Sequence, residues 1–342
     1  MVSIMKKPDK IRKFDVVDFL GNGNFGFVFQ AYDPLLKADR AIKLIKVPKP
    51  EKFVEAVKEA QTLETCRHKH IVDVKEVDVF VYEGTPCVYI AMEYLAKGSI
   101  QKHLENRFIS IQDSLRIVSE ALLGLEHAHN SNVLHRDIKP GNILFGDNGE
   151  AKLSDFGLAL DYHVDPSDTM GYRPHQPLEV IEGNPMDKLS DVYAMGITLF
   201  RLINNIPEVE FNFKTVDEWH AAVKANKYPE RCYQPHIPRK IKTVINKAIN
   251  NDPGKRFQSA SEFRQAIENI GIPIDWRPID DDSWMGTGIN GESYELQRQR
   301  KRNGWIIEYK KNGRKVKENC HKELSDSQVD SEFFKIISSS NA

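Results

Sequence analysis

Two short motifs near the middle of the chain hold the side chains best suited to chemistry. The first, HRDIKPGN, runs from His135 to Asn142, and the second, DFG, begins at Asp155 after a short strand-like run. Together they supply two carboxylates, a lysine and an amide. These groups suit phosphoryl transfer, because that reaction needs an aligned hydroxyl, clamped phosphates and neutralising cations rather than covalent help from the protein.

Each of these four side chains has a distinct role in such a transfer. We expect Asp137 to orient an acceptor hydroxyl and accept its proton. Asn142 and Asp155 carry oxygen atoms that suit a hard cation, so we expect them to hold Mg²⁺ against the phosphates. Lys139 adds a positive charge near the transferred group. The alternative, that all four are only turn and cap residues, requires two complete motifs to coincide by chance.

A glycine-rich turn near the start of the chain is the candidate phosphate cover. The sequence GNGNFGFV begins at position 21 and lies between two strand-like runs. A dinucleotide site places such glycines between a strand and a helix, whereas a strand follows here, which favours a flap over nucleotide phosphates. An ordinary glycine hairpin is the alternative. The residues expected to contact the nucleotide are Leu20, Gly21, Asn22, Gly23, Gly26 and Val28.

Lys43 lies on the next strand-like run, AIKLIKV, where a long cation reaches the phosphates of a nucleotide held under the glycine turn. A lone lysine on a strand is usually solvated. The amphipathic segment from position 51 to 68 predicts a helix, and its spacing favours Glu59 as the ion-pair partner of Lys43 over Glu55 and Glu64.

The elements that position these residues fall into two classes. Strand patterns dominate from Phe14 to about Arg40 and return in VYIAMEYL from Val88. Helical periodicity predicts helices over 111–130, 188–205 and 259–270. The pattern predicts an α+β chain with a β-rich lobe followed by an α-helical lobe.

Composition excludes several classes of protein. The chain has 342 residues, a formal net charge of −1 and 40% hydrophobic residues, as in an ordinary globular protein. Its four cysteines have no C-x-x-C spacing, which disfavours a zinc site or a disulfide framework. The N-terminus is charged and no apolar run is long enough for a membrane span, so we expect a cytoplasmic protein.

Together these residues resemble the eukaryotic-type protein kinase family over roughly residues 14–270. The resemblance implies a bilobal fold, with an N-lobe at 14–93 and a C-lobe at 94–270, after a short extension at 1–13. It implies transfer of the γ-phosphate of ATP, with Mg²⁺, to Ser or Thr of protein substrates, with autophosphorylation. Lys139 resembles the serine/threonine branch of the family.

The resemblance also assigns roles outside the two motifs. Met92 corresponds to the gatekeeper, Glu93 to Leu95 to the adenine-binding hinge, and Asp191 to the helix aspartate that braces the catalytic loop. Three apolar residues form the walls around the adenine: Val28, Ala41 and Leu144.

The activation segment departs from the family pattern. Alignment on the family places Pro174-His175-Gln176 where Ala-Pro-Glu is expected, which gives the late Arg256 a neutral partner unless Glu179 takes over that role. A phosphate on Ser167 or Thr169 is expected to pair with Arg136. The alternative is that the aspartates of this segment already supply the negative charge.

Residues 271–342 form a C-terminal extension of unassigned fold. Asn312-Gly313 between two strand-like runs predicts a type I′ hairpin. Nine Lys or Arg stand against a single acid between Arg298 and Lys317, with Trp305 and Tyr309 interleaved. We expect a solvated or autoinhibitory docking surface here, with nucleic-acid binding less favoured and a protein partner or an acidic membrane surface as the remaining alternatives.

Two other functions remain open at this stage. One is an ATP-binding pseudokinase or scaffold, supported by the missing Ala-Pro-Glu. The other is a small-molecule kinase of the aminoglycoside type, which shares an aspartate-to-asparagine catalytic loop. The intact Lys43, Asp137, Asn142 and Asp155 disfavour the first, and Lys139 with the full glycine turn disfavours the second. The sequence leaves the substrate, the activating signal and the oligomeric state undetermined.

Overall fold

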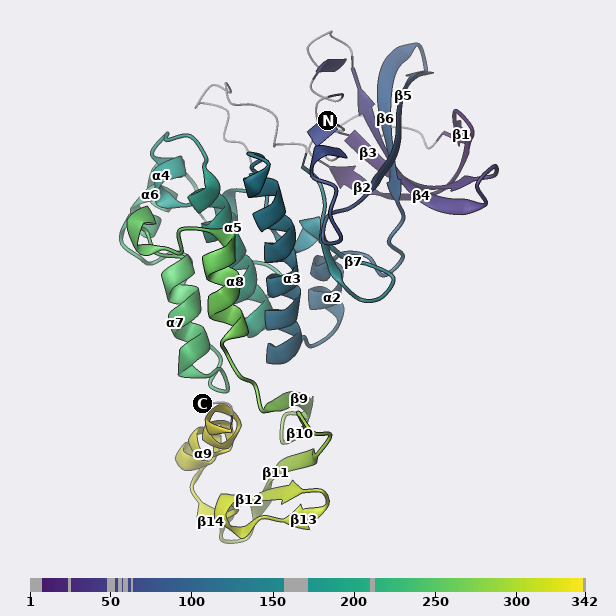
Figure 1. The fold of residues 1–342 in the computed structure, drawn as a ribbon. Coiled ribbons are helices and arrows are strands. Elements are labelled where there is room, and N and C mark those ends of the chain that lie inside the picture. Colours follow the sequence, from purple (N-terminus) through teal and green to yellow (C-terminus); the bar gives the residue numbers. More distant parts are fainter. Residues whose placement is uncertain are drawn as a thin grey trace.

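The computed structural model describes residues 8–23, 26–47, 53–54, 57, 61–62, 64–156, 172–209 and 213–340. Figure 1 shows three stacked parts: a β-sheet, a group of helices and a small domain of strands with one helix. The α+β architecture with a β-rich first lobe and a helical second lobe, expected from the sequence, is confirmed.

The N-terminal lobe is one antiparallel sheet in the order β1-β2-β3-β4-β6-β5. Alternate residues of β3 and β4, among them Phe29, Ala31, Ile42 and Leu44, form its buried face. A Cβ on Gly26 would lie 2.3 Å from the Leu44 carbonyl oxygen, so only glycine lets the two strands approach there. The bounds are β1 Lys10–Ile11, β2 Phe14–Gly23, β3 Gly26–Asp33, β4 Ala38–Lys46, β5 Val74–Tyr82 and β6 Thr85–Glu93.

The segment expected to form an amphipathic helix is helical at every described position from Phe53 to Thr65. Glu59 lies outside the described residues. Its expected pairing with Lys43 therefore stays a prediction from the sequence.

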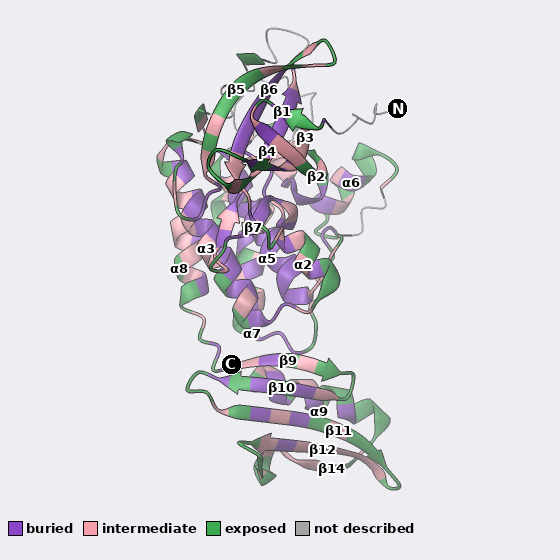
Figure 2. Ribbon diagram, turned by 90° about the vertical axis from the view of Figure 1, so that its right-hand side faces the viewer, coloured by how far each residue is buried: buried purple, intermediate pink, exposed green. Residues whose placement is uncertain are grey.

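The second lobe packs its helices around α5, which is buried along nearly its whole length. Figure 2 shows α5 enclosed by its neighbours, and α3 contacts both α5 and α8. A capping box at Asp187 begins α5, and Ser110 caps the first turn of α3. The bounds are α2 Ile100–Asn106, α3 Ile111–Asn130, α4 Leu178–Ile181, α5 Lys188–Asn204, α6 Val216–Lys224, α7 Arg239–Ala248 and α8 Ala260–Glu268, with the hairpin β7 Ile143–Phe145 and β8 Ala151–Leu153.

The segment that precedes β5 in the N-terminal lobe lies directly against α3. A Cβ on Gly124 would stand 2.4 Å from the carbonyl oxygen of His70, so this helix position must be glycine. The same carbonyl accepts a hydrogen bond from the Leu153 N–H at 2.9 Å. This contact ties the sheet, α3 and the β7–β8 hairpin together beside the DFG motif.

The C-terminal extension folds into a separate layer with its own core. The strands pair in the order β13-β12-β11-β10-β9, β14 pairs with β12, and α9 packs Phe333 and Ile337 against Leu296 and Ile307. The predicted hairpin turn is confirmed, since Asn312 has φ 50° and Gly313 has φ 74°. The bounds are β9 Ile274–Asp280, β10 Ser283–Gly288, β11 Ser293–Lys301, β12 Gly304–Lys311, β13 Arg314–Lys315, β14 His321–Leu324 and α9 Asp326–Ser339.

This small domain contacts the base of the helical lobe through an aromatic cluster. The ring of Trp284 lies 5.8 Å from Phe108 and 5.0 Å from His236, measured between centroids. Arg277 of β9 donates to the Asp113 carboxylate of α3 at 2.7 Å. Figure 2 shows the small sheet below the helices, with buried and exposed residues alternating along β9 and β10.

Two expectations about the whole chain can be compared with the described residues. The cysteines Cys66, Cys87, Cys232 and Cys320 are all free thiols. Among the described helices, none combines the length and apolar character needed to cross a bilayer.

Candidate active site

A cavity of about 380 Å³ lies between the N-terminal sheet and the helical lobe. Strands β2, β3 and β4 form its roof, the β6–α2 connection its back, and the HRDIKPGN loop with β7 its floor. The sequence-predicted residues that line it are Leu20, Gly21, Asn22, Val28, Ala41, Lys43, Met92, Glu93, Leu95, Asn142, Leu144 and Asp155.

Two predicted glycines are not among the lining residues. Gly26 serves the approach of β3 to β4, and Gly23 is the last residue of β2. Sequence reasoning missed other residues of the cavity, and three of these, Ala96, Gly98 and Ser99, belong to the β6–α2 connection, whose path depends on the whole fold. The others are Val72, Lys102, Gly141 and Ser154.

Lys43 and Asp155 meet inside this cavity. The Lys43 ammonium lies 2.7 Å from Asp155 Oδ1, and the lysine side chain is 4% exposed. Burial would raise the pKa of the Asp155 carboxyl, but the nearby Lys43 charge outweighs burial and holds that pKa below its ordinary value. Asp155 is therefore an anion over the whole physiological pH range, with φ 60° in the left-handed region.

Asp137 has one carboxylate oxygen that is fixed and one that is not. Oδ2 accepts hydrogen bonds from Lys139 Nζ at 2.7 Å and Asn142 Nδ2 at 2.9 Å. Oδ1 is buried and has no hydrogen-bond partner in the described part of the chain. A buried acceptor without a donor is costly in a resting protein and typical of a site that receives a ligand hydrogen bond.

The backbone turn before Asp137 is held by Asp191 of α5. Asp191 Oδ2 accepts the His135 N–H at 2.9 Å, and Oδ1 accepts the Arg136 N–H at 2.8 Å. His129 of α3 contacts the same carboxylate at 2.9 Å. Burial opposes the charge, but His129 holds the pKa of Asp191 below its ordinary value. The bracing role assigned to Asp191 by resemblance therefore has the expected contacts.

His135 joins the two motifs. Its Nε2 donates to the Ser154 carbonyl at 3.0 Å, while its Nδ1 accepts the Asp137 N–H at 3.3 Å. Its ring lies 4.5 Å from that of Phe156. Burial lowers the pKa of His135, which fits the neutral ring that this hydrogen-bond pattern requires.

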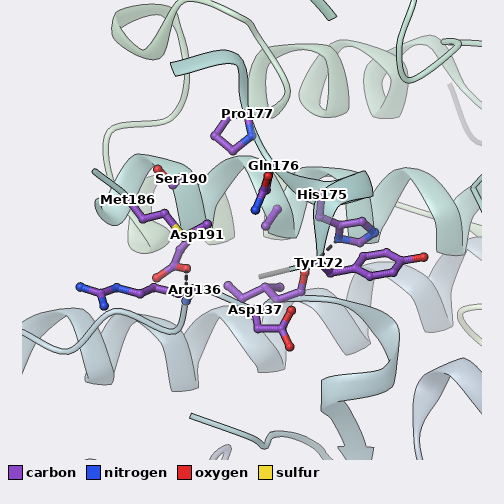
Figure 3. A pocket seen from close by; sticks show the side chains of 11 residues that line it. Arg136, Asp137, Tyr172, His175, Gln176, Pro177, Met186, Ser190 and Asp191 are labelled. Atoms are coloured by element: carbon purple, nitrogen blue, oxygen red, sulfur yellow. Dashed lines mark hydrogen bonds between the residues drawn. The ribbon is translucent and has the colours of Figure 1, made fainter. Parts of the chain in front are cut away.

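His175 is a positioning residue that sequence reasoning did not identify. Its Nδ1 donates to the Ile138 carbonyl at 2.9 Å, next to Asp137, and its Nε2 lies 3.3 Å from Arg201 Nη1. Figure 3 shows His175 beside Tyr172, with Asp137 below and Asp191 reaching the backbone of Arg136. Burial and the Arg201 charge hold the pKa of His175 well below 6.5, so the ring is neutral.

The ion-pair partner of Arg256 is not Gln176, the residue that alignment on the family pattern assigned to it. Arg256 donates to both carboxylate oxygens of Glu179, at 2.6 and 2.7 Å. Placing Gln176 at the end of the Ala-Pro-Glu position was therefore wrong, and the alternative with Glu179 is correct. The chain reaches this position as Pro177-Leu178-Glu179, three residues later than expected, and the charged pair is kept.

The donor set fits a hard divalent cation. Asn142 uses its amide nitrogen on Asp137, at 2.8 Å to the carbonyl and 2.9 Å to the carboxylate, so the amide oxygen is left for another ligand. The Asp155 carboxylate carries its charge in the same cavity. Carboxylate and amide oxygens are the ligands that Mg²⁺ and Ca²⁺ prefer.

Comparisons with known proteins agree with this geometry. The model of the protein kinase domain matches residues 14–267. The chain is 26% identical to the serine/threonine-protein kinase PrkC of Bacillus subtilis, over 75% of this chain and 40% of that protein. It is 29% identical to a serine/threonine-protein kinase of Gallus gallus, over 82% of this chain and 66% of that protein.

A third relative is the serine/threonine-protein kinase PknB of Mycobacterium leprae, which is 27% identical over 75% of this chain and 43% of its own length. The chain thus spans less than half of the two bacterial relatives named here and about two thirds of the avian one.

Proposed function

The chain belongs to the protein kinase domain family, and from this premise we propose that it transfers the γ-phosphate of ATP to serine or threonine hydroxyls of protein substrates. The single observation that carries the proposal is the buried Oδ1 of Asp137, which has no hydrogen-bond partner among the described residues, beside an Oδ2 that accepts two hydrogen bonds. A substrate hydroxyl supplies the missing donor. Asp137 Oδ1 then aligns that hydroxyl and receives its proton as the phosphoryl group leaves ATP.

The remaining polar residues position charge around the reacting groups. Lys43, fixed by Asp155 at 2.7 Å, reaches the nucleotide phosphates from the roof of the cavity. Lys139, at 2.7 Å from Asp137 Oδ2, places a positive charge beside the transferred group. Asn142 and Asp155 hold Mg²⁺, which when bound neutralises charge on the phosphates. Glu59 retains its proposed role as a second anchor for Lys43.

The apolar part of the cavity suits an adenine ring. Val28, Ala41 and Leu144 line it from above and below, and Met92 stands at its back. The backbone from Glu93 to Leu95 lines the cavity, where we place the edge of the adenine ring. Glu93 itself is occupied as a brace, since its Oε1 accepts from the Asp73 N–H at 2.8 Å and Lys152 at 2.7 Å.

We propose the domain limits as 14–270 for the kinase domain and 271–342 for the extension. In support, the family match ends at residue 267, α8 ends at Glu268 and β9 begins at Ile274. A cytoplasmic location and regulation through Ser167 or Thr169 also stay proposals. Both of these residues lie outside the described part of the chain.

The pseudokinase alternative loses its support. It rested on the missing Ala-Pro-Glu glutamate, and Glu179 supplies that carboxylate to Arg256. The small-molecule alternative is less favoured because the relatives that the chain resembles are serine/threonine-protein kinases.

The basic stretch of the extension favours a structural role over nucleic-acid binding. Five of its nine cations form ion pairs with acids: Arg298, Arg300, Lys310, Lys311 and Lys315. Tyr309 is 5% exposed in the small-domain core, so it is not available to stack on a base. An oligonucleotide that binds at low salt, and is lost on truncation at Pro278, would contradict this view.

The experiment for the main proposal uses purified protein, radiolabelled ATP, Mg²⁺ and a mixture of proteins beside a mixture of sugars and aminoglycosides. The proposal expects label in protein, recovered as phosphoserine or phosphothreonine after hydrolysis. Label in a small molecule alone would favour the aminoglycoside-kinase alternative.

A further inference from the structure

A second cavity, of about 480 Å³, lies where the helical lobe meets the small domain. Its walls come from α2, α3, the β7–β8 hairpin and β9. Figure 1 shows β9 just below the lower end of α3, which it contacts. None of the described residues lines both this cavity and the nucleotide cavity, so we call it the junction cavity.

The floor of the junction cavity is apolar. Ile109, Ile117 and Phe145 are 6%, 1% and 8% exposed, and Phe108 covers the side toward Trp284. Their positions are fixed by the core of the helical lobe. Phe108 is partly exposed, so it gains free energy when an apolar side chain displaces water from its ring.

The rim is dominated by cations. Lys97, Arg107, Arg116 and Arg277 line the junction cavity, whereas Asp113 is the one acid among the described lining residues. Asp113 is shared, since it accepts from Arg277 at 2.7 Å and lies 3.7 Å from Arg116. Glu120 and Asp275, outside the lining, also pair with these arginines. The two arginines therefore have carboxylate partners already.

Lys97 and Arg107 differ from those arginines, because neither forms an ion pair with a carboxylate in the described ranges. Lys97 Nζ donates only to the Asp147 carbonyl, at 2.6 Å. Arg107 is exposed and directly follows the last residue of α2. The ring of His103 also lines the cavity beside these two cations. Its Nε2 lies 2.6 Å from the Lys97 carbonyl oxygen, whereas its buried Nδ1 has no hydrogen-bond partner among the residues described.

From an apolar floor with two cations at its rim that have no carboxylate partner among the described residues, we propose that the junction cavity binds an acidic segment of a protein substrate. An apolar side chain of that segment packs against the partly exposed ring of Phe108, and its carboxylates pair with Lys97 and Arg107. The apolar floor favours a peptide over a nucleic acid. This inference rests on the proposed kinase function and adds a docking site apart from the catalytic cavity.

The position of the junction cavity gives docking a kinetic consequence. Lys97 lies between Ala96 and Gly98, which both line the nucleotide cavity. A substrate held there by its acidic segment presents its acceptor hydroxyl to Asp137 as an intramolecular event, with an effective concentration in the millimolar range for a short linker. Docking therefore lowers KM without changing the chemical step.

The test uses a fluorescein-labelled peptide in which pairs of glutamates alternate with leucine and phenylalanine. Its anisotropy is followed with full-length wild type and with Arg107→Glu and Lys97→Gln. The control is Lys240→Glu on α7, an exposed lysine for which the described structure contains no ion pair. We expect Kd to rise about tenfold for Arg107→Glu and to stay at the wild-type value for Lys240→Glu.

A second measurement separates docking from catalysis. A short serine peptide that the enzyme phosphorylates is assayed alone and joined to the acidic peptide. Docking predicts a KM about tenfold lower for the joined peptide with wild type, no such gain with Arg107→Glu, and an equal KM for the short peptide with both proteins.

The outcomes are distinct. No binding of the acidic peptide, equal binding by Arg107→Glu, or tighter binding of an oligonucleotide of the same charge overturns the docking site, even if the short peptide is phosphorylated. Arg107-dependent binding without phosphorylation of any peptide supports the ligand class of the cavity and contradicts the kinase function instead.

Discussion

Arg256 and Glu179 form a two-pronged ion pair in which the arginine side chain is fully buried and the glutamate is 16% exposed. Arg256 also donates to the carbonyl oxygens of Asn250 and Leu189, at 2.6 and 3.2 Å. The pair ties α4, which follows the activation segment, to the chain between α7 and α8. The ion pair thereby fixes the position of α4 within the helical lobe.

Removing Glu179 is expected to destabilise the protein strongly. Glu179→Ala leaves the Arg256 guanidinium buried without a counter-ion, which costs about 3–5 kcal/mol. Glu182→Ala, at a side chain 39% exposed, is the control and should change the free energy of unfolding by less than about 1 kcal/mol. Urea unfolding measures both. Equal stability of the two variants would contradict the role given to Glu179.

Lys43→Met is expected to lower phosphoryl transfer at least about a hundredfold, because it removes the cation aimed at the nucleotide phosphates. Lys46→Met is the matched control on the same strand, and it is not among the residues that line the nucleotide cavity. Initial rates of label transfer report the effect. Comparable losses in the two variants would show that strand β4, rather than the Lys43 ammonium, was disturbed.

Gly124→Ala tests the close approach of the segment before β5 to α3. Alanine favours a helix over glycine by about 1 kcal/mol, yet its Cβ would lie 2.4 Å from the His70 carbonyl oxygen. We expect a net destabilisation of about 1–3 kcal/mol, as for other overpacked sites. Gly271→Ala, with no heavy atom within 4 Å of the new Cβ, is the control. A stabilised Gly124→Ala variant would refute the contact.

Because His236 is buried at the junction with the small domain, we expect the stability of the protein to fall in acid. Burial among Phe108, Trp284 and Phe334 lowers the pKa of His236 to about 4. The unfolded chain takes up a proton near pH 6.5 while the folded chain does not, so stability falls as the pH drops from 6.5 toward 4. This single group accounts for about 2 kcal/mol between pH 7.5 and 5.0.

His236→Gln is therefore expected to reduce the loss of unfolding free energy between these two pH values by about 2 kcal/mol. His220→Gln, at a half-exposed histidine of α6, should behave as wild type. Urea titrations of wild type and both variants at pH 7.5 and 5.0 give the six unfolding free energies. If the unfolding free energy of His236→Gln depended on pH as that of wild type does, a buried neutral His236 ring would be ruled out as the cause.

The sequence predicted the active site better than the parts around it. Local motifs bring Asp137, Lys139 and Asn142 together, because they lie within one turn whatever the rest of the fold does. The apolar residues that line the nucleotide cavity could also be identified from the resemblance to the protein kinase family. The role of Glu179 was offered only as an alternative, because a shift of three residues in the activation segment becomes visible only through its distant partner Arg256.

Other features depended on contacts that no local pattern contains. His175 acquires its role from Ile138 and Arg201, which are distant in the sequence. The basic stretch suggested an open charged surface, but all its ion-pair partners except Glu308 lie outside the stretch, as with Asp282 and Asp330 for Arg298. Strand β5 and helix α9 were not predicted, although alternating β-branched residues mark the strand and a capping box begins the helix.

The most direct test of the central claim compares wild type with Asp137→Asn. Asparagine keeps the shape of the side chain but cannot receive the proton of an acceptor hydroxyl at neutral pH. Binding of a fluorescent ATP analogue serves as the control for folding, and radiolabelled ATP with Mg²⁺ and a basic protein reports transfer.

We predict nucleotide affinity within about threefold of wild type and a loss of transfer to Ser and Thr of about 10²–10⁴-fold. Transfer by Asp137→Asn at the wild-type rate would contradict the assignment of Asp137 and the mechanism built on it.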